Sequence, residues 1–198
     1  MGPPHERSVR KQLAALDRHC RAFLARSPML FLGTSGADGR CDVSPKGDGP
    51  GFVLVLDDAT LVIPDRPGNR RLDSLDNILA NPHVGLLFVI PGMDETLRVN
   101  GTAQIIQDED LLSQMAVGDR CPQLGILVHV EECYLHCARS FLRAKLWDPS
   151  CHMPRSEMPT LSRMIEDQTR PLDRDAAGHE RAIADSDVRT AEAYRCLY

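Results

Sequence analysis

Three arginines, Arg66, Arg70 and Arg71, lie close together in the stretch "DRPGNRRLD", directly after an apolar run. A guanidinium group offers a planar fork of N–H donors, and backbone N–H groups in a turn that contains glycine can converge on one anion. A helix that begins near Arg71 would add the positive end of its dipole. The stretch therefore predicts a phosphate-binding turn, to which Asn69 could add a side-chain amide, while Asp73 would cap the helix.

A simpler interpretation of the same residues is that they are solvated charges, which pair with the neighbouring carboxylates of Asp65, Asp73 and Asp76. A second polar segment, "DVSPKGD" from Asp42 to Asp48, favours a ligand site instead. It carries Lys46 at the end of a predicted strand, where barrels often hold ligand-binding groups. We therefore expect the two segments to contribute to one site.

The composition limits the classes of partner. The chain has 198 residues with 23 Lys and Arg against 28 Asp and Glu, a formal charge of -5, so a broad nucleic-acid-binding surface is not expected and an anion site must be local. No segment has the apolar length of a signal peptide or membrane span, which predicts a cytoplasmic protein without membrane contact. The seven cysteines are irregularly spaced, which favours reduced thiols over a disulfide framework.

The elements that must position these residues are mostly strands. An amphipathic helix is predicted over Arg7–Phe23, and Pro28 ends it. Seven apolar runs bounded by Gly, Asp and Pro then predict six or so antiparallel strands. These runs cover residues 29–35, 40–45, 51–56, 60–64, 83–91, 95–106 and 124–138. Strands with only short helices between them favour a mainly β fold, a six-stranded antiparallel barrel with flanking helices, over a doubly wound sheet.

Several helices are predicted outside the strands. One follows the arginines, ends at Asn81-Pro82 and has an apolar face of Leu72, Leu75, Ile78 and Leu79. The others are a helix capped by Asp108 that runs to about Val117, a helical turn at 139–147, and two helices at 160–167 and 179–197. The expected organisation is an N-terminal helix at 1–27, a barrel domain at 28–148 and a helical C-terminal extension at 149–198, packed on the barrel or on a second subunit.

The order of these segments resembles a known family. "DVSPKGD", "RPGNRRLDSLDNILANPHVGLLF" and "LRVNGTA" together resemble the pyridoxamine 5'-phosphate oxidase-like, FMN-binding split-barrel family, over about residues 20–148. The tail "HCARSFLRAKLW" resembles a subgroup without a well-defined substrate. The chain ends "AEAYRCLY" and has a single tryptophan, unlike the aromatic-rich, arginine-containing end of the vitamin oxidases, so oxidation of pyridoxamine phosphate is not expected.

The resemblance implies a split barrel that binds FMN between the two subunits of a homodimer. Residues that match the family's phosphate-binding turn are Asn69, Arg70 and Arg71, with Arg66 as a helper. The segment that matches Ser44, Pro45 and Lys46 would run along the flavin ring. Arg143 and Trp147 are further candidates for a flavin or substrate contact, although a solvated helix face with a packed tryptophan explains them equally simply.

FMN would carry the redox chemistry, so no obligatory catalytic side chain is implied. The expected function is an FMN-dependent oxidoreductase that acts on a small organic substrate, with NAD(P)H as a candidate electron donor. Two alternatives stay open: a reductase that uses the deazaflavin F420, and a non-catalytic flavin or haem carrier with His129 or His136 as the axial ligand.

The segment "CYLHC" contains Cys133, His136 and Cys137, but no second pair with metal-ligand spacing exists, so no metal site is expected. Cys133 and Cys137 are predicted to be small core residues. Leu97 and Val99 are predicted to be core residues, Gly101 a position of close backbone approach, and Arg98 a residue that faces the dimer partner.

Overall fold

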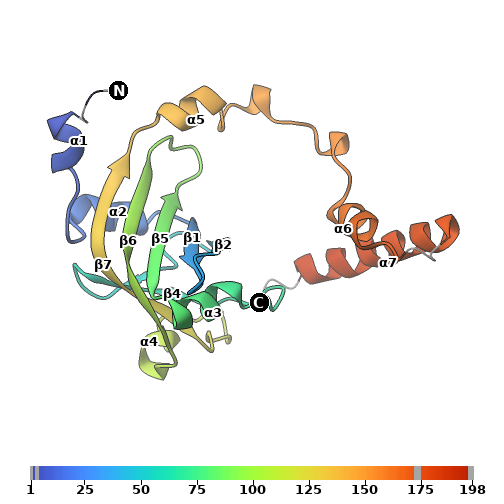
Figure 1. Ribbon diagram of the computed structural model, residues 1–198, viewed down its shortest axis with the longest axis horizontal. Helices are drawn as coiled ribbons and strands as arrows, with labels where there is room; N and C mark the ends of the chain where they lie inside the picture. The colour runs from blue at the N-terminus through green and yellow to red at the C-terminus, as the bar shows by residue number, and fades with distance from the viewer. Residues whose placement is uncertain (1, 3–4, 172–174, 196–198) are drawn as a thin grey trace. The chain divides into compact units, whose positions relative to one another are not determined.

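The computed structural model describes residue 2 and residues 5–171 and 175–195, and the chain divides into two compact units, Met1–Asp148 and Pro149–Tyr198. Within the described part, the first unit contains one seven-stranded antiparallel sheet in the order β2-β1-β5-β6-β7-β4-β3, flanked by helices (Figure 1). This confirms the mainly β fold with flanking helices, with seven strands instead of six. The strands are β1 Met29–Ser35, β2 Cys41–Gly47, β3 Leu54–Val55, β4 Thr60–Pro64, β5 His83–Val89, β6 Thr96–Ile106 and β7 Gly125–His136.

The core lies on the concave side of this sheet, because alternate residues of the long strands are apolar and point the same way. Leu97 and Val99 are fully buried, as predicted, and are joined in one core cluster by apolar residues of every other strand except β2. The strand predicted at 51–56 is much shorter, because only Leu54 and Val55 pair with β4. The preceding residues form the loop that connects the two ends of the sheet.

β6 and β7 form the longest ladder, and the ladder contains an irregularity at Gly101. Asn100 pairs with Glu132 while Gly101 pairs with Val130, so one residue of β7 is left over. A Cβ atom at Gly101 would lie 1.9 Å from the carbonyl oxygen of His129, far inside van der Waals contact. The close approach predicted at Gly101 is confirmed, and only glycine fits it.

The single N-terminal helix predicted over Arg7–Phe23 is wrong, because the structure has two short helices, α1 Glu6–Arg10 and α2 Arg18–Leu24. Between them, Leu13 exchanges backbone hydrogen bonds with Cys133 of β7, at 2.9 and 2.8 Å. Asp17 then begins α2, because its side chain accepts hydrogen bonds from the first backbone N–H groups of that helix. The apolar residues keep a helical spacing through residues 11–17, although Leu13 in this segment pairs with the sheet, and for this reason the spacing predicted one continuous helix.

Helix α3, Asp73–Ala80, lies against β1 and β2 and ends at Asn81 as predicted. Its apolar face is narrower than expected, because Leu75 and Ile78 are buried while Leu72 and Leu79 are 53% and 75% exposed. Side-chain hydrogen bonds attach it to the sheet: Ser74 Oγ to Asp42 (2.9 Å), Asn77 Nδ2 to Thr34 (3.0 Å) and Asn81 Nδ2 to Ser35 (2.7 Å). The first of these bonds fixes the start of α3 beside β2, and the other two join the rest of the helix to β1.

Two more helices of the first unit follow the prediction in part. α4, Glu109–Ser113, is capped by Asp108, whose carboxylate accepts a hydrogen bond from the N–H of Leu111, but it ends before Val117. α5, Arg139–Ala144, follows β7 where a helical turn was predicted.

In the second unit, two short 3-10 turns, η1 Pro149–Cys151 and η2 Arg155–Glu157, precede α6 Leu161–Thr169 and α7 Ala176–Arg195. α6 and α7 pack together through an Arg163–Glu180 ion pair (2.6 Å) and a His179–Asp167 hydrogen bond (2.6 Å). Both helices were predicted, and the last two residues of the predicted second helix lie outside the described residues. A helix long and apolar enough to cross a membrane does not occur among the residues described.

Candidate functional site

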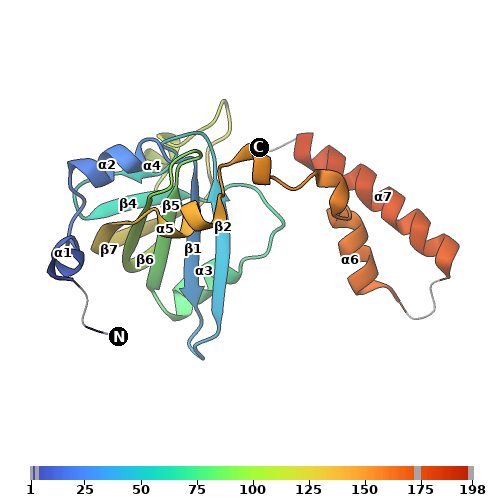
Figure 2. The ribbon, with the colours of Figure 1, turned by 90° about the horizontal axis from the view of Figure 1, so that it is seen from above.

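The two polar segments singled out in the sequence meet at one pocket of about 660 Å³. The loop from β4 to α3 runs past β2, which lies beside β1 (Figure 2). Ser44, Pro45 and Lys46 form one side of this pocket, and residues 64–72 form the other. Its volume falls in the range of about 300–1,000 Å³ typical of small-molecule sites. We call it the anion pocket.

Arg66 lies in the wall of the anion pocket and is held by the protein itself. Its Nε donates to the Asp48 carboxylate at 2.6 Å, and its Nη2 donates to the carbonyl of Met115 at 2.8 Å. The two charged side chains are only 16% and 6% exposed. Because these contacts engage the guanidinium, Arg66 mainly fixes the loop. Its carboxylate partner is Asp48, and not Asp65, Asp73 or Asp76 as the simpler interpretation predicted.

Arg70 and Arg71 are the exposed cations of the turn. Arg70 has a left-handed backbone (φ 60°), which costs a non-glycine residue on the order of 1 kcal/mol. Its side chain forms no hydrogen bond or ion pair with any residue that the structure describes. Arg71 bonds to Asp73 at 2.9 Å, as the simpler interpretation predicted, and its backbone N–H donates to the Asn69 side-chain oxygen at 3.0 Å. The Asn69 amide group keeps its N–H donors.

The start of α3 adds backbone donors to this turn. The N-cap residue is Leu72, whose apolar side chain cannot accept a hydrogen bond from the helix. The prediction that Asp73 caps the helix is wrong, because Asp73 is the first helical residue and pairs with Arg71. The first N–H groups of the helix therefore keep their capacity to bind an anion. An uncapped helix start, two exposed guanidinium groups and an amide thus gather hydrogen-bond donors and positive charge at one side of the pocket.

On the β2 side, Lys46 Nζ lies 3.6 Å from Asp65, and the two side chains are 20% and 29% exposed. This pair joins the strand to the loop and leaves the ammonium group at the pocket surface. Pro45 is exposed and Ser44 is half-buried on the opposite side of the strand.

Arg143 and Trp147 do not line the anion pocket in a single chain. Trp147 donates through its indole N–H to the Met93 carbonyl at 3.0 Å and packs beside Phe141 at a separate hollow of about 270 Å³. Arg143 is exposed on α5. A contact of either residue with a cofactor stays a prediction for a second copy of the chain.

The "CYLHC" segment is only partly as predicted. Cys133 is fully buried, whereas Cys137 lies beyond the end of β7 and is exposed, so its assignment to the core is wrong. His136 stands beside Tyr134, with ring centres 5.0 Å apart. Desolvation, and then the charges of Arg98 and Lys11, lower the pKa of His136. The described residues contain no group of three or more His, Cys, Asp or Glu arranged to hold a metal.

Two contributors to the site were not recognised in the sequence, Asp48 and Phe52. Asp48 stands in the quoted "DVSPKGD", but nothing in its spacing indicates a partner eighteen residues away. Phe52 lines the anion pocket from the loop that was predicted to be a strand.

Comparison with solved structures finds similar chains at low identity. HupZ from Group A Streptococcus has 18% identity and a TM-score of 0.48, over 60% of this chain and 91% of that chain. General Stress Protein 26 from Bacillus anthracis has 16% identity and a TM-score of 0.45, over 58% and 88%. An FMN-binding protein from Syntrophomonas wolfei has 9% identity and a TM-score of 0.47, over 59% and 83%.

Curated proteins include none that matches the chain. Among protein families, the model for pyridoxamine 5'-phosphate oxidase matches residues 16–139, which span the sheet and the anion pocket. The chain therefore belongs to the pyridoxamine 5'-phosphate oxidase family.

Proposed function

We propose that this protein is an FMN-dependent oxidoreductase that acts on a small organic substrate by hydride or electron transfer at the flavin. The observation that carries the proposal is the anion pocket, where Arg70, Arg71 and the uncapped start of α3 face one volume of about 660 Å³. These donors fit the phosphate of FMN. When bound, FMN supplies the redox chemistry, and the protein orients the ring.

The chain's own residues have separate tasks in this proposal. Arg70 and Arg71 bind the phosphate, with the Asn69 amide as a further donor. Arg66 holds the loop in the shape that the phosphate requires, through Asp48. Lys46 lies on the strand that would run along the ring, where its charge would favour the electron-rich form of a bound ring system.

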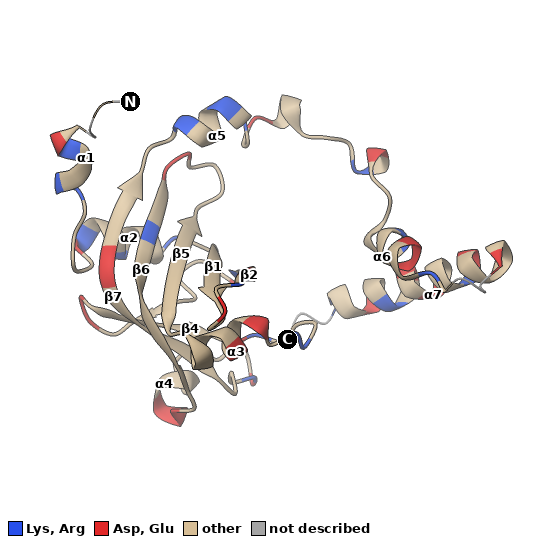
Figure 3. Cartoon of the chain, in the orientation of Figure 1, with Lys and Arg blue, Asp and Glu red and all other residues tan. Residues whose placement is uncertain are grey.

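Homodimerisation is part of the proposal, and the outer face of the sheet supports it. On that face Phe31 pairs with Pro45 and Leu87, and Gly33 pairs with Val43 and Gly85. Val43 is 66% and Phe31 39% exposed, and neither β1 nor β5 carries a charged residue (Figure 3). An apolar face of this kind is suited to burial against a second copy. Since Pro45 also lines the anion pocket, the partner would stand beside the bound ring.

A reductase that uses F420 is the second candidate. F420 has a longer and more acidic tail than FMN, which would need a more extended basic groove. Arg66 is already bonded to Asp48, so only Arg70 and Arg71 remain as exposed arginines of the turn. The pocket therefore favours FMN, whose side chain ends in a phosphate, over the longer and more acidic tail of F420.

The proposal is tested by flavin content and oligomeric state, measured together. Val43→Lys places a charge on the exposed apolar face without touching the core. We expect the wild type to be a dimer with bound FMN, and the variant to be a folded monomer with less flavin. A wild-type monomer that retains FMN would contradict a shared site, and uptake of F420 in preference to FMN would favour the second candidate.

A further inference from the structure

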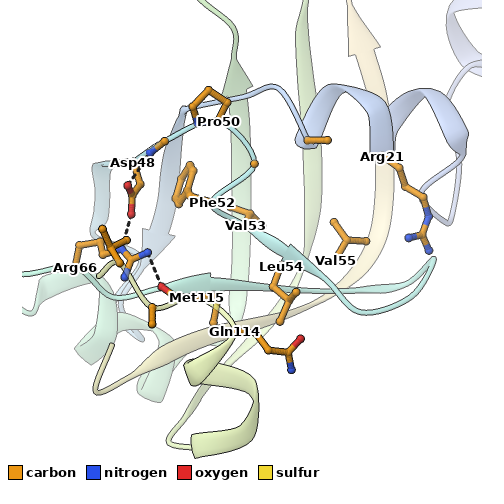
Figure 4. Close-up of a pocket in the computed structure, with 15 residues that line it drawn as sticks. Arg21, Asp48, Pro50, Phe52, Val53, Leu54, Val55, Arg66, Gln114 and Met115 are labelled. Carbon is orange, nitrogen blue, oxygen red and sulfur yellow. Dashed lines mark hydrogen bonds and ion pairs between the residues drawn. The ribbon is translucent and has the colours of Figure 1, made fainter. Parts of the chain in front are cut away.

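A second pocket, of about 620 Å³, lies on the other side of Arg66 and Phe52 from the anion pocket. Four segments form it: the loop and strand of residues 48–55, the α2 residues Arg21 and Ala25, residues 114–117 after α4, and Arg66 of the loop after β4 (Figure 4). The two pockets share only Arg66 and Phe52 among their lining residues. We call the second one the apolar pocket.

The walls of the apolar pocket are fixed by contacts that do not involve a ligand. Arg66 joins Asp48 to the Met115 carbonyl, and so ties the loop to the segment after α4 (Figure 4). On the α2 side, the backbone of Gly51 donates to Ser27 at 3.2 Å. Gly51 has a φ of 80°, and a Cβ there would lie 3.0 Å from the Ala25 carbonyl oxygen. The pocket is therefore preformed, which lowers the entropic cost of binding.

Most of its lining is apolar. Phe52, Leu54 and Val55 contribute partly exposed side chains, whereas Val53 and Met115 are buried in the wall, at 5% and 6% exposure (Figure 4). The other apolar residues that line it are Ala25, Pro50, Ala116 and Val117. A ligand of this pocket must therefore have a hydrocarbon or aromatic body.

Charged side chains lie at both ends of the pocket, but the two ends differ in whether a polar atom remains available to bind a ligand. At one end, both oxygens of Asp48 are engaged, Oδ2 by Arg66 and Oδ1 by the N–H of Gly49 at 2.6 Å. At the other end, Arg21 directs Nε and Nη2 to a single oxygen of Asp58. Its Nη1 makes no hydrogen bond with any described residue, and its side chain is 38% exposed. The end near Arg21 can accept an anionic group.

We propose that the apolar pocket is a binding site for a small aromatic or aliphatic molecule with one carboxylate or sulfonate group, its body against Phe52 and its anion at Arg21. This site is distinct from the anion pocket. The proposal does not depend on which anion the neighbouring pocket holds, because the walls are formed without it.

The probe for this site is anilinonaphthalene sulfonate (ANS), which carries fused rings and one sulfonate and fluoresces when it leaves water. Ala116→Trp and, independently, Gln114→Trp fill the pocket from its exposed rim, and Ala80→Trp on α3 is a matched control outside it. We expect ANS to bind the full-length wild type and Ala80→Trp equally, and both rim variants to lose at least about tenfold in affinity. Arg21→Gln should weaken binding by about fivefold, as for an exposed ion pair.

Circular dichroism and thermal unfolding verify that each variant is folded. Arg70→Ala/Arg71→Ala and Val43→Lys should leave ANS affinity unchanged, because they alter the anion pocket and the outer sheet face. Loss of ANS binding in either would place the dye at those surfaces and overturn the proposal. Wild-type affinity in both rim variants would overturn it as well.

Discussion

The affinity for FMN should depend on Arg70 and Arg71 to an extent that follows from their surroundings. A hydrogen bond to a charged group is worth about 1.5–3 kcal/mol when it is protected from water. Both side chains are exposed, Arg71 to 74%, so we take about 1–2 kcal/mol for Arg70. Arg71 must loosen its contact with Asp73, which is worth about 0.2–1 kcal/mol, so its net contribution is smaller. The two together give about 2–3 kcal/mol.

This sum corresponds to a rise of about 30- to 150-fold in the dissociation constant of FMN for Arg70→Ala/Arg71→Ala. The assay is fluorescence titration of FMN with the flavin-free protein. Arg120→Ala, another exposed arginine of the first unit, is the control and should stay within about twofold of the wild type. Raising the salt from about 0.05 M to about 0.5 M should weaken the wild type more than the double variant. A double variant that binds FMN within about twofold of the wild type would refute the phosphate assignment.

Three further predictions concern stability and thiol chemistry. Asp48→Ala leaves the largely buried Arg66 guanidinium without its carboxylate, so it should lower the free energy of unfolding, measured in urea, by about 2–3 kcal/mol. A loss below about 0.5 kcal/mol would show that the ion pair does not stabilise the fold. A hydrogen bond from the backbone N–H of Cys20 lowers the pKa of Asp17, so the ionised cap stabilises the fold above the ordinary carboxyl pKa, and this stabilisation is lost as the pH falls. Asp17→Ala should therefore lower the free energy of unfolding by about 1 kcal/mol at neutral pH and by much less at acid pH. An equal loss at both pH values would be inconsistent with an ionised cap. Burial, and then a hydrogen bond with Asp17, raise the pKa of Cys20 to about 12, and burial also raises the pKa of Cys133. Both thiols should therefore react with a thiol reagent only after the protein unfolds. Rapid reaction in the native protein would contradict their burial. Among the cysteines that the structure describes, those expected to react in the native state are Cys41, Cys121, Cys137 and Cys151.

The sequence predicted the fold correctly where the apolar periodicity and the positions of Gly and Pro indicated the same element. Strand alternation predicted the buried Leu97 and Val99, and a glycine inside a strand predicted the close approach at Gly101. It failed where tertiary contacts override local pattern. Leu13 has helical spacing but pairs with Cys133 of β7, a residue far away in the chain.

The candidate site shows the same division. The turn chemistry around Arg70 and Arg71 is local and was visible in the sequence. The role of Arg66 was not, because its partner Asp48 is brought to it by the loop that connects the two ends of the sheet. The apolar pocket could not be predicted for the same reason, since its walls come from four segments separated along the chain.

The most direct test of the central claim is an absorption spectrum of the purified protein, followed by mass analysis of any small molecule released by heat. A flavin bound at the anion pocket predicts flavin bands and released FMN in the wild type, and both should be reduced in Arg70→Ala/Arg71→Ala. A colourless wild-type protein that takes up no added FMN would contradict the proposal.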